Sequence, residues 1–183
     1  MPFESDIERE RDQLRSSGLE RRPRVIGSSQ QPEVLIEGRK VIGFCSNNYL
    51  GFANHSDLVA AAMKALREFG VGAAASRQVS GTMDIHLQAE RRLTRFTGFE
   101  SCVLFSSGYA ANIGTIQALA GASDVLFSDS LNHASIIDGC RLSRARVEIF
   151  RHSDPEDLQK LLYRQRNSGA KALVISEAVF SMD

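Results

Sequence analysis

Hydrophobic residues in the first half of the chain recur mainly with helical spacing. Residues 56–70 carry apolar side chains every three or four positions, which predicts an amphipathic helix closed by a glycine. A second helix is predicted over 84–98, again ending at a glycine. The side chains expected to face inward from it are Leu87, Leu93 and Phe96. Between the helices, residues 70–81 are mostly small and lack a period, which indicates a backbone close to another backbone or to a ligand.

The N-terminal residues form weaker patterns. Residues 4–17 mix many charges with few apolar positions, so they predict a marginal helix that acts as an arm and not as core. Two short apolar runs at 34–36 and 41–44 flank a turn, which is the pattern of a β-hairpin. We therefore expect an N-terminal arm and hairpin over 1–45 and the first part of a larger domain over 46–183.

Strand and helix patterns alternate from residue 101 onward. The strands expected are 101–105, 124–129, 147–150 and 172–176, and the helices expected are 109–119, 134–142 and 154–163. Strands separated by helices pair in parallel, and the helices cover both faces of the sheet. The predicted fold class is therefore α/β with a mostly parallel sheet.

The last residues, 177–183, follow a strand of the buried type and are not themselves followed by a helical pattern. Three or four strands with an uncovered edge would form an incomplete layer. We therefore expect the chain to be a fragment of a longer protein.

Composition narrows the classes of partner. The 183 residues are 43% hydrophobic and carry 22 basic and 22 acidic side chains, and no basic stripe points to nucleic acid. No apolar window has the length of a membrane span, and the N-terminus lacks the apolar region of a signal peptide. The cysteines, Cys45, Cys102 and Cys140, are odd in number and lack metal-binding spacing, which indicates reduced thiols. A cytoplasmic protein without a metal site is expected.

The most informative stretch is 101–112, an apolar run that breaks at Gly108 and restarts with helical spacing. It predicts a strand, a tight turn and a helix, with Ser106 and Ser107 beside the unpaired N–H groups of the helix start. Gly108 would take backbone angles closed to other residues and let a ligand approach the main chain. Such a helix start suits an anion such as phosphate, and an ordinary strand-to-helix turn is the alternative. The stretch matches neither the dinucleotide-binding nor the P-loop pattern.

His133 stands in a polar turn after a predicted strand, at the sheet edge where open α/β sheets place their ligands. One interpretation is a ring that stacks on a flat cofactor or holds a proton near neutral pH. The alternative is a polar residue that caps the following helix. The predicted phosphate cradle follows a neighbouring strand, so both features would share one rim of the sheet.

Together these segments resemble the α-oxoamine synthases, pyridoxal phosphate enzymes of fold type I. The matching segments are SNNYLG at 46–51, VSGT at 79–82, DIH at 84–86, FSSGYAAN at 105–112, SD at 128–129, LNHASIIDG at 131–139 and EAVFSMD at 177–183. They occur in family order over nearly the whole chain from residue 20. The resemblance implies the N-terminal segment and the first part of the large, mostly parallel domain of such an enzyme.

The resemblance also implies roles for particular residues. Ser107, Gly108 and Tyr109 match the segment that holds the cofactor phosphate, and His133 matches the catalytic imidazole stacked on the pyridine ring. Glu177 and Ser181 match the strand-end segment beside the ring, with Ser181 near the phenolic oxygen of the cofactor.

Two further matches concern the substrate. Asn47 corresponds to a residue near the substrate carboxylate, and Arg21 falls near a substrate-binding arginine. Because Arg22 and Arg24 lie close by, the register of the arginine match stays open.

The family condenses an amino acid with an acyl-CoA thioester as a homodimer with shared active sites. Its Schiff-base lysine and the aspartate that pairs with the pyridinium nitrogen are expected beyond residue 183. The lysines present, Lys40, Lys64, Lys160 and Lys171, lie in no matching motif and are expected to be surface residues. The chain alone is therefore expected to be inactive.

Within the family, 106–112 favours the branch that serves biotin synthesis. The segments 82–86 and 131–139 are equally similar to the 2-amino-3-ketobutyrate CoA ligases, which remain the alternative. A different class of function also stays open, namely a non-catalytic interaction module that has kept only the dimer surface.

Overall fold

The structure is a computed structural model that describes residues 2–181. The chain divides into two compact units, one up to Ala74 and one from Ala75 onward. This division concerns packing, and the predicted functional division at residue 45 stays a prediction. No helix in the described range has the length and apolar character needed to cross a membrane.

The first unit contains two helices and a hairpin. Helix α1 spans Pro2–Ser16, a 3-10 turn spans Phe52–Asn54, and α2 spans Ser56–Phe69. Strands β1 (Glu33–Ile36) and β2 (Arg39–Ile42) pair antiparallel, as the sequence predicted. Their two-residue turn holds Glu37 and Gly38 at φ angles of 50° and 77°, as a tight hairpin turn requires.

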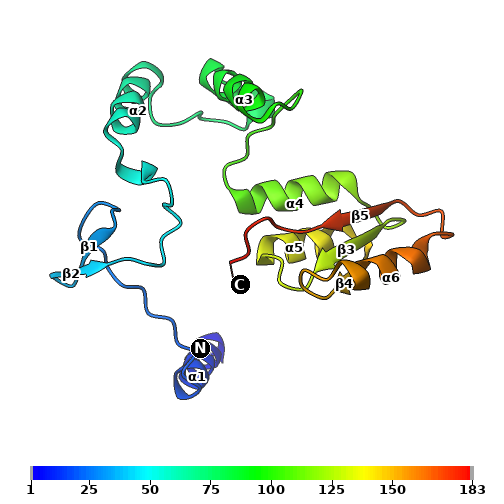
Figure 1. Cartoon of the computed structure of the whole chain (residues 1–183). Helices are drawn as coiled ribbons and strands as arrows, with labels where there is room; N and C mark the ends of the chain where they lie inside the picture. The colour runs from blue at the N-terminus through cyan, green and yellow to red at the C-terminus, as the bar shows by residue number, and fades with distance from the viewer. Residues whose placement is uncertain (1, 182–183) are drawn as a thin grey trace. The chain divides into compact units, whose positions relative to one another are not determined.

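The second unit contains a parallel sheet and its helices (Figure 1). Its elements are a π-helical turn at Arg77–Gly81, α3 (Asp84–Thr97), α4 (Gly108–Leu119), β3 (Val125–Asp129), α5 (Ala134–Ser143), β4 (Arg146–Phe150), α6 (Pro155–Gln165) and β5 (Ala172–Ile175). The strand order is β4-β3-β5, and both pairings of the central strand β3 are parallel. The predicted α/β class is confirmed.

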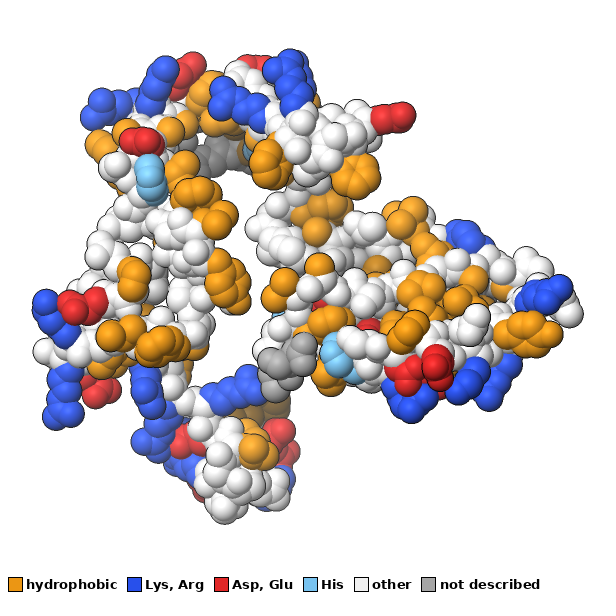
Figure 2. Space-filling model, viewed as in Figure 1, with side chains coloured by type: hydrophobic (Ala, Val, Ile, Leu, Met, Phe, Trp, Pro, Cys, Tyr) orange, Lys and Arg blue, Asp and Glu red, His pale blue; other side chains and the backbone are white. Residues whose placement is uncertain are grey.

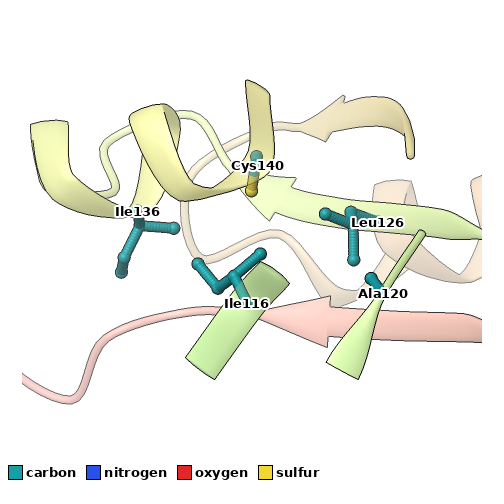
Figure 3. Close-up of a cluster of buried hydrophobic side chains, with 5 residues drawn as sticks. All are labelled: Ile116, Ala120, Leu126, Ile136 and Cys140. Carbon is teal, nitrogen blue, oxygen red and sulfur yellow. The ribbon is translucent and has the colours of Figure 1, made fainter. Parts of the chain in front are cut away.

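The side chains of successive β3 residues point to opposite faces of the sheet. Leu126 packs with Ile116 and Ala120 of the α4 region and with Ile136 and Cys140 of α5 (Figure 3). On the opposite face, Val125 and Phe127 pack with Phe150 and against leucines of α6. Every residue of β3 is buried, and its first three residues, 125–127, form an apolar run that is recognisable from sequence.

The predicted strand at 101–105 is wrong. These residues are irregular, because both edges of β3 are taken by β4 and β5 and no other described strand lies beside them. The backbone N–H of Leu104 instead donates to Oε1 of Glu90 over 3.1 Å. Glu90 also forms an ion pair with Arg77 at 2.5 Å, so one carboxylate ties the glycine-rich turn to this segment.

The glycine-rich stretch does contain the predicted close backbone approach. A Cβ at Gly81 would collide with the carbonyl oxygen of Ala75, so the turn closes only around glycine. The inward face predicted for α3 is wrong, since Leu87, Leu93 and Phe96 are all exposed and Phe96 is 88% exposed. The hydrophobic side chains in Figure 2 show how much apolar surface the chain presents to solvent.

Candidate functional site

Helix α4 begins at the predicted phosphate cradle. Ser107 is its N-cap, and the Ser107 hydroxyl accepts a hydrogen bond from the N–H of Ala110 over 3.1 Å. Gly108 is the first helical residue and does not adopt a positive φ, so the prediction of backbone angles closed to other residues is wrong. A Cβ at this position would meet no described atom within 4 Å, so the fold itself leaves open space beside Gly108.

The start of α4 has the chemistry of an anion site. Among the described residues, no acceptor is hydrogen-bonded to the backbone N–H groups of Gly108 and Tyr109. The positive end of the helix dipole and these two donors favour a phosphate group, which fits the open space above Gly108.

Two side-chain hydrogen bonds join the amino ends of α4 and α5. The hydroxyl of Tyr109 donates to the carboxylate of Asp138, and the amide of Asn112 donates to Ser135 Oγ over 2.9 Å. The hydrogen bond to Asp138, partial burial and the negative charge of that carboxylate raise the pKa of the Tyr109 phenol. The phenol therefore stays protonated at neutral pH and holds the two helix starts side by side.

His133 is the N-cap of α5 and is exposed. Its Nδ1 accepts from the N–H of Ser135 at 3.2 Å and lies 2.7 Å from the Ser135 hydroxyl. The backbone N–H of His133 donates to Oε2 of Glu177 over 2.7 Å. The capping interpretation is confirmed, because Nδ1 of His133 caps α5. The stacking of its ring on a cofactor stays a prediction.

Glu177 and Ser181 follow β5 at the same edge of the sheet as His133. Glu177 is half-buried and contacts the His133 turn directly, while Ser181 is exposed. The structure thus brings together Glu177 and His133, which are 44 residues apart in the chain. The final two residues of the matching segment 177–183 lie outside the described range.

Asp129 is a residue of this edge whose contacts were not anticipated. Its carboxylate accepts from the N–H of Leu131 at 2.9 Å and of Ser153 at 3.1 Å, and it pairs with Nδ1 of His152 at 2.9 Å. Burial would raise the pKa of the Asp129 carboxyl, but the hydrogen bonds from Leu131, His152 and Ser153 outweigh it and lower the pKa. Polar residues at the carboxyl ends of two neighbouring parallel strands are the sequence signal that could have revealed this pair.

Arg21 and Asn47 belong to the first unit, and both are exposed. Arg22, one of the alternatives in register, pairs with Glu20 at 2.8 Å. The roles proposed for Arg21 and Asn47 at a substrate stay predictions.

Two of the lysines form ion pairs, each within its own unit. Lys171 pairs at 3.4 Å with Asp124, which precedes β3 at the amino edge of the sheet, and Lys40 pairs with Glu33 in the hairpin at 3.0 Å. Within the second unit, Lys171 therefore lies at the edge of the sheet opposite to His133.

Comparison with known proteins defines the class. Residues 39–183 match the family described as aminotransferase class I and II, and the chain belongs to that family. Within it, the chain is 52% identical to the 8-amino-7-oxononanoate synthase of Geobacter sulfurreducens, over 95% of this chain and 44% of that protein. It is 47% identical to the corresponding enzyme of Coprothermobacter proteolyticus, over 100% of this chain and 46% of the relative.

Solved structures agree with this class. The serine palmitoyltransferase of Sphingomonas wittichii superposes with a TM-score of 0.86 at 41% identity, covering 97% of this chain and 45% of that one. The S. paucimobilis enzyme, solved with PLP and myriocin bound, superposes with a TM-score of 0.87 at 37% identity, over 97% of this chain and 45% of its own. The chain thus has the α-oxoamine synthase type of fold and spans a little under half the length of the proteins it matches.

Proposed function

We propose that the natural protein containing this chain is a pyridoxal phosphate-dependent acyltransferase of the 8-amino-7-oxononanoate synthase type. The observation that carries the proposal is the joining of the α4 start, His133 and Glu177 at one edge of the sheet. The 52% identity to an enzyme of that name supports the choice of reaction.

The chain's own residues would hold the cofactor by its two ends. The N–H groups of Gly108 and Tyr109, with the Ser107 hydroxyl, would bind the phosphate, and the His133 ring would lie on the face of the pyridine. Ser181 would approach the phenolic oxygen. When bound, pyridoxal phosphate supplies the electron sink that stabilises negative charge on the amino acid Cα.

The substrates follow from the product named by the relatives. In 8-amino-7-oxononanoate, the amino carbon and the terminal methyl are those of alanine after loss of its carboxylate as CO2. The remaining carbons, including the ketone, are those of a seven-carbon dicarboxylic acyl group delivered as a thioester. Asn47 and Arg21 are proposed to bind the carboxylates of these substrates.

The full-length protein, meaning the natural protein that contains this chain, should be tested with pyridoxal phosphate and two substrate pairs. We expect alanine with the seven-carbon acyl-CoA to give CO2 and a product of the mass of 8-amino-7-oxononanoate. Product only from glycine and acetyl-CoA, with the carboxylate retained, would replace the proposal with the 2-amino-3-ketobutyrate ligase reaction. No product from either pair in a folded, cofactor-saturated protein would favour a non-catalytic interaction module.

The proposal includes a homodimer with shared active sites. Large apolar side chains of α2 and α3 stay exposed, among them Met63 at 50% and Phe96 at 88%, which is consistent with a surface covered by another copy. Sedimentation of the full-length protein should give a dimer, and a fully active monomer would refute this part. The 183-residue chain alone is expected to show no turnover.

A further inference from the structure

The carboxylate of Asp129 closes two turns at the carboxyl edge of the sheet. On one side lies the turn that leads to His133, where the Leu131 N–H donates to the side chain and the Asn132 N–H donates to the Asp129 carbonyl at 3.2 Å. On the other side lies the turn between β4 and α6, where the Ser153 N–H donates to the same carboxylate. Asp129 is only 3% exposed, so water does not replace these donors.

His152 extends this connection to the segment after β5. Its Nδ1 donates to Asp129, and its ring meets the ring of Phe180 edge to face, with centroids 4.5 Å apart and planes at 82°. Phe180 directly precedes Ser181. The strained backbone of Ser153, at a φ of 50°, is held in place by its hydrogen bond to Asp129.

These contacts form a closed circuit. The chain runs from Asp129 through Leu131 to His133, and the His133 N–H reaches Glu177. From Glu177 the backbone continues to Phe180, whose ring contacts the ring of His152. His152 in turn is hydrogen-bonded to Asp129, where the series of contacts began. A closed circuit restrains each member more than an open chain of contacts would, because each turn is held from both ends.

We propose that Asp129 and His152 are a positioning pair that sets the location of His133 relative to the 177–181 segment. Neither side chain would touch the substrate; each acts through the turns that it holds. The inference rests on the proposed function for its consequence in catalysis, since His133 and Ser181 are the residues proposed to contact the cofactor. The geometric part stands on the second unit alone.

The test is Asp129→Asn in the full-length protein, with Asp124→Asn as the matched control. Asp124 precedes the same strand at its other end and likewise accepts a backbone hydrogen bond, from Gly121 at 2.9 Å, and pairs with a cation. In Asp129→Asn, hydrogen exchange in the peptide covering 130–137 should accelerate about tenfold, the loss expected for one hydrogen bond to a charged group. With Asp124→Asn, exchange in that peptide should match the wild type.

Catalytic and spectroscopic readouts follow in the same variants. Asp129→Asn should change the visible circular dichroism of bound pyridoxal phosphate and lower kcat about tenfold, while KM for the amino acid changes less than about threefold. Asp124→Asn should keep the dichroism of the wild type. Equal effects of the two substitutions on exchange and dichroism would overturn the positioning role.

If the Asp129→Asn variant fails to fold, the His152→Phe variant is tested in its place. The phenylalanine keeps a ring against Phe180 but removes the hydrogen bond to Asp129. It should accelerate exchange in 130–137 about threefold or more, and exchange at the wild-type rate would overturn the proposal. Exchange is measured without cofactor and so separates the two claims. Accelerated exchange in a protein without acyltransferase activity would refute only the proposed function, and an active protein with unchanged exchange would refute only the positioning pair.

Discussion

The carboxylate of Glu177 accepts a hydrogen bond of 2.7 Å from the backbone N–H of His133. This contact joins the start of α5 to the segment after β5, although α5, β4, α6 and β5 lie between them in the sequence. The position of His133 at the start of α5 is therefore coupled to the position of the segment after β5. A substitution that moves one is expected to move the other.

We predict that Glu177→Leu lowers kcat of the full-length protein about tenfold, because the His133 N–H loses a charged acceptor. Glu177→Gln keeps an acceptor oxygen and should stay within about threefold of the wild type. Steady-state kinetics of the two variants checks this. Equal losses in both would show that the charge of Glu177, and not the hydrogen bond to His133, matters.

Gly108→Val should weaken binding of pyridoxal phosphate about tenfold or more, since the added side chain fills the space where the phosphate is proposed to lie. The protein itself leaves that space open, so a clash within the fold does not explain a loss. Gly121→Val, just beyond the other end of α4 and also in open space, is the control and should bind normally. Titration of the cofactor by absorbance gives both constants, and equal affinity of Gly108→Val and wild type would remove the cradle assignment.

The two roles of His133 can be separated by substitution. His133→Asn retains an N-cap side chain for α5 but lacks the ring, whereas His133→Ala lacks both. Both variants should lose turnover to a similar extent, and only His133→Ala should also lose stability, by about 1 kcal/mol. Denaturant unfolding and kcat are measured on each. Normal turnover in His133→Asn would mean that the ring is not used.

The pH dependence of stability should contain a contribution from Asp129. Its pKa in the folded chain lies below the ordinary value of 3.8, so its stabilisation is present above that pH and is lost as the pH falls through the lower folded value. The difference in unfolding free energy between the wild type and Asp129→Asn should therefore shrink between about pH 5 and pH 2. Other carboxyls with lowered pKa values, including Glu90 and Asp124, are present in both proteins and cancel. A difference independent of pH would contradict the ionised state of Asp129.

The strands and helices around the sheet were predictable because local patterns determine them. β3 begins with three apolar residues, α4 has a serine cap, and α6 begins with Asp154 as cap followed by Pro155. Residues 101–105 have the composition of a strand, but a strand also needs a partner, and composition does not reveal whether one is present. The prediction that one face of α3 is buried was wrong for a similar reason. Periodicity shows which face of a helix is apolar, but it does not show whether another element covers that face.

At the candidate site, the sequence indicated Gly108 and His133 because one stands at a helix start and the other follows a strand, whereas Glu177 came only from the family resemblance. The positive φ expected at Gly108 was wrong, because a glycine in a sequence does not reveal the backbone angle that it adopts. The Asp129–His152 pair lies 23 residues apart and depends on the parallel register of β3 with β4. Polar residues at two strand ends are a signal for such a contact, but pairing them also requires knowing that the two strands are neighbours.

A crystal structure of the full-length protein with pyridoxal phosphate tests the central claim most directly. The proposal predicts phosphate oxygens within hydrogen-bonding distance of the Gly108 and Tyr109 N–H groups and the His133 ring parallel to the pyridine. A cofactor bound with its phosphate elsewhere, or with the His133 ring turned away from it, would contradict the proposal.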